Sequence, residues 1–205
     1  MPATSTKRST SGRKTTRRQT GTNHRSGMDA ISLLKKDHGT VRQLLKRLES
    51  STENGRGDSG ELLRQIENEL KIHTQIEEEI FYPAFRDAVE SEDDQRLYYE
   101  ALEEHRVVDL VMPEIKSKRK NSDEFAAKAK VLKDLVEHHA KEEETHMFPK
   151  ARRAIGAAGL RELGQRLKER KQELMRGGRT SQGTIERVLR PFLSNDRNSK
   201  RRRAA

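Results

Sequence analysis

Residues 73–83 read HTQIEEEIFYP, and residues 139–149 read HAKEEETHMFP. At an offset of 66 residues, the two stretches share a histidine, a glutamate four residues later, an aromatic residue and a closing proline. Side chains four residues apart lie on one face of a helix, about one turn apart. Each stretch therefore predicts a helix that presents an imidazole beside a carboxylate, one from His73 and Glu77, the other from His139 and Glu143.

A shorter repeat precedes each of these stretches. Asp37-His38 and Glu104-His105 align at an offset of 67 residues. The chain thus has two similar halves, and each half has one isolated histidine followed by one histidine–glutamate pair. Two helical hairpins related by this repeat would form a pseudo-symmetric site.

Apolar residues surround the four histidines with helical spacing. They recur at steps of three and four residues over 31–48, 63–80, 98–115 and 125–143, which is the pattern of amphipathic helices. No segment shows sustained alternation of apolar and polar residues, so we expect no strand. Four helices of about 20–30 residues with short connections predict an all-α, up-down-up-down four-helix bundle.

The four histidines also share a depth in this bundle. His38, His73, His105 and His139 follow one another at separations of 35, 32 and 34 residues. Each lies about 12–17 residues from its adjoining predicted turn, or about 18–26 Å along the helix axis. In an up-down-up-down bundle, all four histidines then reach one layer.

The two glutamates suggest what such a layer does. A carboxylate buried in an apolar bundle is costly unless it is paired or bound to a metal. Four imidazoles and two carboxylates without a thiolate suit iron, manganese or, less well, zinc. The inventory describes a dinuclear centre with two imidazoles per metal, two bridging carboxylates and open coordination positions. A ferritin-like site fits less well, because it uses Glu-x-x-His spacing and more glutamates.

The order His, His-x-x-x-Glu, His, His-x-x-x-Glu over residues 29–155 resembles the hemerythrin-like HHE cation-binding family. The resemblance implies a non-haem di-iron site inside a four-helix bundle, with two iron ions as cofactors and manganese or zinc as alternatives. The ligands that it implies are the histidines His38, His73, His105 and His139 and the bridging glutamates Glu77 and Glu143.

One feature departs from the oxygen-carrying hemerythrins that this layout resembles. Those proteins have an additional histidine on the third helix, four residues from another, whereas the corresponding neighbours of His105 are Ala101 and Asp109. We expect Asp109 to be solvated rather than a ligand. The missing donor favours binding and turnover of oxygen, peroxide or nitric oxide over reversible oxygen carriage.

Other side chains near the six residues have simpler interpretations. His138 points about 100° away from His139 and is expected at the surface. His146, two turns beyond His139, is a weaker candidate for an extra ligand or gate, and Tyr98 is expected to pack, although its phenol could reach a metal. We also expect core packing from Phe81, Tyr82, Met147 and Phe148, and solvation of Glu78, Glu79, Glu142 and Glu144.

Charge is unevenly distributed along the 205 residues. Residues 1–28 hold seven basic residues and no acidic one, and residues 161–205 hold fourteen basic and five acidic ones. Of the net charge of +10, the intervening part therefore carries −6. We predict a bundle domain over 29–155, an additional polar helix over 156–178 that ends at Gly177-Gly178, and basic, disordered tails over 1–28 and 179–205.

Composition excludes several classes of protein. The chain has no cysteine, which excludes a disulfide scaffold, a thiolate metal site and a cysteine nucleophile. No apolar run approaches the roughly 20 residues of a membrane-spanning helix, and the first residues lack the apolar region of a secretory signal. We therefore expect a cytoplasmic protein without a membrane partner.

The leading functional hypothesis is a non-haem di-iron protein that handles or senses oxygen, peroxide, nitric oxide or iron, and the sequence leaves open whether it is an enzyme. The alternative is a nucleic-acid-associated helical protein whose basic tails contact phosphates nonspecifically and whose metal bundle is an interaction module. Apart from Phe192 the tails lack aromatic residues, so base stacking is not indicated. A third hypothesis is a structural bundle with incidental histidines.

Overall fold

The computed structural model describes residues 27–53 and 57–193, with side chains described as far as residue 177. Every element in these ranges is helical, and none of their residues forms a strand. The prediction of an all-α fold is confirmed. Most of the predicted tails, residues 1–26 and 194–205, lie outside the described residues.

The described chain contains α-helices and two short π-helical turns, named η1 and η2. The elements are α1 (Ala30–Glu53), α2 (Ser59–Ile76), η1 (Glu77–Phe81), α3 (Tyr82–Ala88), α4 (Glu92–Ser117), α5 (Asp123–Glu142), η2 (Glu143–Met147) and α6 (Phe148–Leu193).

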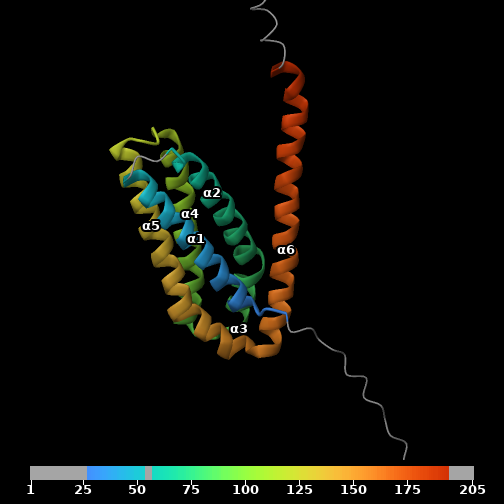
Figure 1. The fold of residues 1–205 in the computed structure, drawn as a ribbon. Helices are drawn as coiled ribbons and strands as arrows, with labels where there is room; N and C mark the ends of the chain where they lie inside the picture. Colours follow the sequence, from blue (N-terminus) through green and yellow to red (C-terminus); the bar gives the residue numbers. More distant parts are fainter. Residues whose placement is uncertain (1–26, 54–56, 194–205) are drawn as a thin grey trace, which may run out of the picture.

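Helices α1, α2, α4 and α5 form the predicted bundle (Figure 1). α1 packs against α2 and α5, and α4 packs against α5 and, less extensively, α2. Serine side chains cap the N-termini of two of the helices. The Ser91 hydroxyl accepts a hydrogen bond from the Asp94 amide at the start of α4, and Ser122 does the same for Phe125 in α5, so these helix ends are capped.

A polar layer divides the bundle core into two apolar clusters. One cluster lies toward the α1–α2 and α4–α5 connections and includes Ile66 and Phe125. The other lies where α3 and α6 close the bundle and includes Leu34 and Phe81. Along each bundle helix, the predicted histidine lies between the residues of the two clusters, so all four reach the same layer.

The two repeated stretches share a backbone irregularity. The amide of Tyr82 donates to the carbonyl of Glu77, and the amide of Phe148 donates to that of Glu143, each across five residues. The proline that follows has no N–H, and its ring would clash with the carbonyl four residues earlier. The preceding turn therefore widens into a π turn. Such turns are frequent at functional sites.

Helix α6 differs from the short helix that the sequence predicts. Its path breaks at Gly156, whose φ of 75° and ψ of 168° are accessible essentially to glycine alone. The prediction that Gly177-Gly178 ends the helix is wrong, because the helix continues to Leu193. A glycine inside a helix costs only about 1 kcal/mol, so without a left-handed backbone it does not terminate one. Part of the predicted tail is therefore helical.

Beyond Gly156, α6 packs along α1 and α2. Its residues Leu160, Leu163 and Leu167 belong to the cluster that closes the bundle. At Gly164 the helix approaches the start of α1 so closely that a Cβ atom would overlap the backbone of Met28. The additional helix is therefore an integral layer over one side of the bundle (Figure 1).

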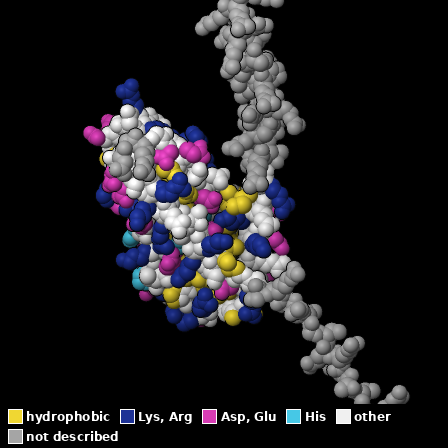
Figure 2. Space-filling view, viewed as in Figure 1, with side chains coloured by type: hydrophobic (Ala, Val, Ile, Leu, Met, Phe, Trp, Pro, Cys, Tyr) yellow, Lys and Arg dark blue, Asp and Glu magenta, His cyan; other side chains and the backbone are white. Residues whose placement is uncertain are grey.

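The surface is strongly charged. Basic and acidic side chains are interspersed over the face of the bundle shown in Figure 2. Within the described part of the chain, no helix is both long enough and apolar enough to cross a lipid bilayer.

Candidate metal centre

Four imidazoles meet in the polar layer, one from each bundle helix. Each is at most 6 % exposed. The Nε2 atoms of His38 and His73 are 3.1 Å apart, and those of His105 and His139 are also 3.1 Å apart. The layer that the residue separations predict is therefore present, and within it the imidazoles form two pairs.

Two buried carboxylates lie between these pairs. Oε2 of Glu77 is 3.2 Å from Nε2 of His73 and 3.5 Å from Nε2 of His105. Oε2 of Glu143 is 3.1 Å from Nε2 of His38 and 3.6 Å from Nε2 of His139. Each carboxylate thus contacts one imidazole of each pair. The structure brings together all the predicted site residues: His38, His73, Glu77, His105, His139 and Glu143.

Further carboxylates hold the imidazoles from outside. Nδ1 of His38 donates to Glu144 at 2.8 Å, and Nδ1 of His105 donates to Glu78 at 2.8 Å. Glu78 is solvated as predicted, with 44 % of its side chain exposed, although it also holds His105; the prediction that Glu144 is solvated is wrong, because it is partly buried against His38. Glu144 is only 22 % exposed and also accepts from Arg42.

The acidic residues that precede the isolated histidines, Asp37 and Glu104, also lie on the outer side of imidazoles. Nδ1 of His139 donates to Glu104 at 2.7 Å, whereas Nδ1 of His73 faces Asp37 at 3.8 Å, which is too far for a hydrogen bond. Such partners fix the tautomer of a metal-binding imidazole and direct its other nitrogen inward. The outer carboxylates follow the sequence repeat, since each has its counterpart in the other half of the chain.

Hydrogen bonding alone does not satisfy this layer. If both rings are neutral, the Nδ1 atoms of His105 and His139 donate to carboxylates and each Nε2 atom is an acceptor, so that two acceptors face each other at 3.1 Å. Oε1 of Glu77 is buried and has no hydrogen-bond partner among the described residues. Cations bound in the layer would be coordinated by these unpaired acceptor atoms. The donor set therefore fits two metal ions better than incidental histidines.

The two buried glutamates have opposite electrostatic environments. Burial, together with the charge of Glu143, raises the pKa of Glu77 well above its ordinary value. Burial also penalises the charged form of Glu143, but the imidazoles of His139 and His38 hold its pKa well below the ordinary value. Burial lowers the pKa of His73 to about 4, against the opposing effect of Asp37. His73 is therefore neutral at pH 7 and available as a ligand.

Tyr82 belongs to the site, although the sequence suggests only core packing. Its hydroxyl lies 2.9 Å from Oε1 of Glu143, to which it donates, 3.2 Å from Nε2 of His105 and 3.4 Å from Oε2 of Glu77. Burial and the two carboxylates raise its pKa well above the ordinary value. The sequence feature that could have identified it is its place in the repeated stretch, five residues after Glu77.

The repeat counterpart of Tyr82 is Phe148, so the two halves of the layer are not equivalent. The Phe148 ring stacks on His38 with centroids 5.8 Å apart, and the Tyr82 ring stacks on His105 with centroids 5.5 Å apart. The stacking is shared, but the hydroxyl is not. Among the described residues of the layer there is thus one phenol, and its hydroxyl lies beside His105 of α4 and Glu143 of η2.

The hemerythrin HHE cation binding domain model matches residues 29–151, more than half of the chain. The chain belongs to the hemerythrin HHE cation-binding family. The family that the histidine and glutamate pattern resembles is thereby confirmed. Membership supports cation binding by the bundle.

Two known proteins are similar to this HHE protein. A crystal structure of a hemerythrin HHE cation binding domain-containing protein from Mycobacterium kansasii has a TM-score of 0.62 and 26 % sequence identity, and covers 79 % of this chain and 92 % of its own. A DNA nickase from Nostoc sp. is 27 % identical over 147 residues, which is 72 % of this chain and 40 % of the nickase. The chain spans less than half the length of that relative.

Several residues singled out in the sequence stay outside the HHE site. Asp109 is exposed. His138 is 64 % exposed and faces Glu104, and His146 is 55 % exposed and faces Glu142. Tyr98 packs edge-on against the Tyr82 ring, at 6.3 Å between centroids. His146 is therefore not placed as an extra ligand.

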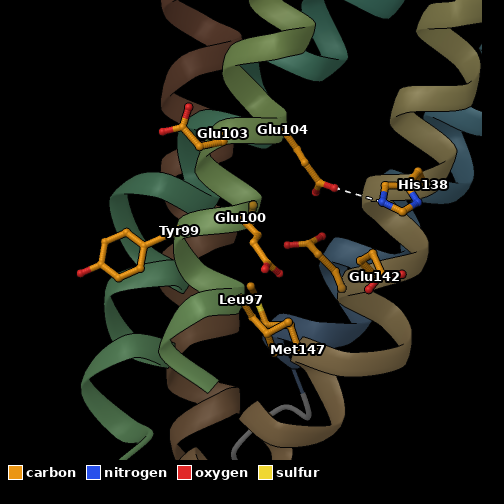
Figure 3. A pocket seen from close by; sticks show the side chains of 10 residues that line it. Leu97, Tyr99, Glu100, Glu103, Glu104, His138, Glu142 and Met147 are labelled. Atoms are coloured by element: carbon orange, nitrogen blue, oxygen red, sulfur yellow. Dashed lines mark ion pairs between the residues drawn. The ribbon is translucent and has the colours of Figure 1, made fainter. Parts of the chain in front are cut away.

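A groove between α4 and the α5–η2 segment opens beside the site (Figure 3). Its volume is about 640 Å³. The ten residues that line this α4–α5 groove are Leu97, Tyr99, Glu100, Ala101, Glu103 and Glu104 on one side and His138, Glu142, Glu143 and Met147 on the other. Ala101, one of the two residues four positions from His105, is therefore beside the opening of the site.

Proposed function

We propose that this HHE protein holds a non-haem di-iron centre and uses it to handle or sense oxygen, peroxide, nitric oxide or iron. The ligands in this proposal are His38, His73, His105 and His139, with Glu77 and Glu143 as bridges. The observation that carries the proposal is that each buried carboxylate contacts one imidazole of each pair. That arrangement suits a carboxylate shared by two cations. A cytoplasmic location stays a prediction.

The protein's own side chains prepare this layer for small ligands. Bound iron would supply oxidation and reduction and open positions for oxygen or nitrogen ligands. The outer carboxylates keep the Nε2 atoms of His38, His105 and His139 directed inward. The Tyr82 hydroxyl donates a hydrogen bond at Glu143, and the two apolar clusters exclude bulk water above and below.

Metal analysis tests the proposal directly. Full-length protein purified without added metal should contain close to two iron atoms per chain, and its optical spectrum in air should report oxidised iron. Manganese or zinc at the same stoichiometry would replace the iron assignment while keeping the site. Protein that holds fewer than two ions per chain after reconstitution would contradict a dinuclear centre.

We further propose that the centre turns over its ligand instead of carrying oxygen reversibly. Ala101 has no donor atom, and Asp109 is exposed, so neither supplies the additional ligand of oxygen carriers. The iron-loaded protein should therefore decompose peroxide. Ala101→His should slow this decomposition, whereas Asp109→His serves as a matched control that leaves it unchanged. Equal rates for Ala101→His and the unmodified protein, at equal iron content, would contradict the proposal.

Nucleic-acid association is the second candidate function. It is supported by the similarity to a DNA nickase and by the seven basic residues among residues 1–28. Contacts to phosphates release counterions, so such binding weakens steeply with salt. Retention on duplex DNA should fall between 50 and 200 mM salt, on the order of tenfold or more. A variant without residues 1–26 and 194–205 should lose that retention, and unchanged retention would rule out the tails.

A further inference from the structure

We propose that the α4–α5 groove is the entrance through which a divalent cation reaches the metal centre. The inference rests on the proposed di-iron function and adds the route by which the centre is loaded.

The groove leads to a buried carboxylate of the centre. Glu143 lines the groove although it is only 2 % exposed, and its Oε2 atom makes no hydrogen bond with the described residues. That oxygen lies 3.1 Å from Nε2 of His38. A cation that follows the groove therefore meets the shared carboxylate before it reaches the imidazoles.

The walls of the groove favour cations. Glu100 and Glu104 extend from α4 toward α5, whereas the side chains of Tyr99 and Glu103 are directed away from α5 (Figure 3). Glu142 lines the opposite side, and none of the ten lining residues is lysine or arginine. A cleft lined by one sign of charge raises the local concentration of oppositely charged ions and their rate of association, and carboxylate oxygens suit hard divalent cations.

The other half of the pseudo-symmetric site is closed at the equivalent positions. By the repeat offsets, Leu33 and Leu34 take the places of Glu100 and Ala101. Leu33 is 8 % exposed and Leu34 is fully buried, and both belong to the cluster completed by α6. The groove is therefore open and bordered by carboxylates, whereas its counterpart is apolar and covered.

Helix α6 also places a positive charge on the closed side. Nζ of Lys171 is 2.7 Å from Oδ2 of Asp37, the acid behind His73. The equivalent acid on the open side, Glu104, faces the exposed His138 at 3.4 Å instead. An ammonium group repels an approaching metal ion, so the charge distribution directs cations to the groove.

The test measures metal uptake by the full-length, metal-free protein, with Co²⁺ as the probe and ligand-field absorbance as the readout. Glu100→Gln combined with Glu142→Gln removes two groove charges without touching a ligand. Uptake by this variant should slow by about tenfold at low ionic strength, and the difference should shrink in high salt. Glu90→Gln combined with Glu162→Gln, at exposed positions elsewhere, is the matched control and should load at the original rate.

A second variant tests whether a larger side chain in the groove obstructs the route of the cation. Ala101→Leu copies the residue of the closed half and should slow uptake at every salt concentration while leaving the final stoichiometry at two Co²⁺ per chain. Equal uptake rates for the unmodified protein and both groove variants, with normal helical circular dichroism, would overturn the entrance. Failure of the unmodified protein itself to bind two Co²⁺ would instead overturn the proposed centre, and the entrance with it.

Discussion

At the scale of single residues, Glu77 contacts one imidazole of each pair, and its removal should affect both metals. We expect Glu77→Gln to lose both ions together, because the neutral amide cannot bridge two cations. Glu79→Gln is a suitable control, since Glu79 lies in the same π turn but pairs at the surface with Arg170. The measurement is the number of metal ions bound per chain in the two variants. One tightly held ion in the Glu77 variant would indicate two independent sites.

The same residue predicts a pH dependence with a definite sign. In the metal-free protein, the folded-state pKa of Glu77 lies above the ordinary value of 4.5. The folded state then binds a proton that the unfolded chain releases, so this group lowers the free energy of unfolding as pH rises from 4.5 through the raised pKa.

Metal-free Glu77→Gln should therefore gain stability over the unmodified protein as pH rises above 4.5. Urea unfolding with chelator between pH 4.5 and 7.5 measures the difference. Glu79→Gln should show no such gain, because contact with Arg170 lowers the pKa of Glu79. A Glu77 variant that is equally or less stable at neutral pH would show that this carboxylate is not penalised by burial.

At the scale of elements, the break in α6 depends on one glycine. Gly156 has φ of 75° and ψ of 168°, a region that other residues occupy at a cost of about 1–3 kcal/mol. Gly156→Ala should lower the free energy of unfolding by that amount, because α6 could not turn back onto the bundle without strain.

Gly177→Ala is the matched control for this substitution. A Cβ atom there would meet nothing within 4 Å, and alanine favours a helix by about 1 kcal/mol. Urea denaturation should therefore show opposite changes for the two variants. Equal stability of Gly156→Ala and the unmodified protein would mean that the turn forms without the glycine conformation.

At the scale of the whole molecule, the metal layer lies between the two halves of the core. Without cations, six buried polar side chains are poorly satisfied, so binding and folding are linked. A free metal concentration 100 times the dissociation constant should stabilise the native state by about 2.7 kcal/mol for each ion bound. Thermal unfolding with and without chelator measures this stabilisation. Identical melting temperatures would contradict a metal layer buried in the core.

The sequence by itself determined the bundle and the inner layer of the site. Both follow from spacing along single helices, since a stripe at three- and four-residue steps and a glutamate four residues after a histidine are local properties of the helix. Equal distances from the connecting turns then brought His38, His73, His105 and His139 to one depth. Those relations hold whatever the exact angles between the helices.

Only the tertiary structure decided the outer layer and the way into the site. Whether Glu144 is solvated or bonded to His38, and whether Tyr82 merely packs or donates to Glu143, depends on how helices from different halves rotate against one another. The closure of one half by α6 likewise depends on a turn at Gly156 and on contacts more than a hundred residues away in sequence. Spacing within a helix carries no information about such contacts, because they arise only when separate helices pack.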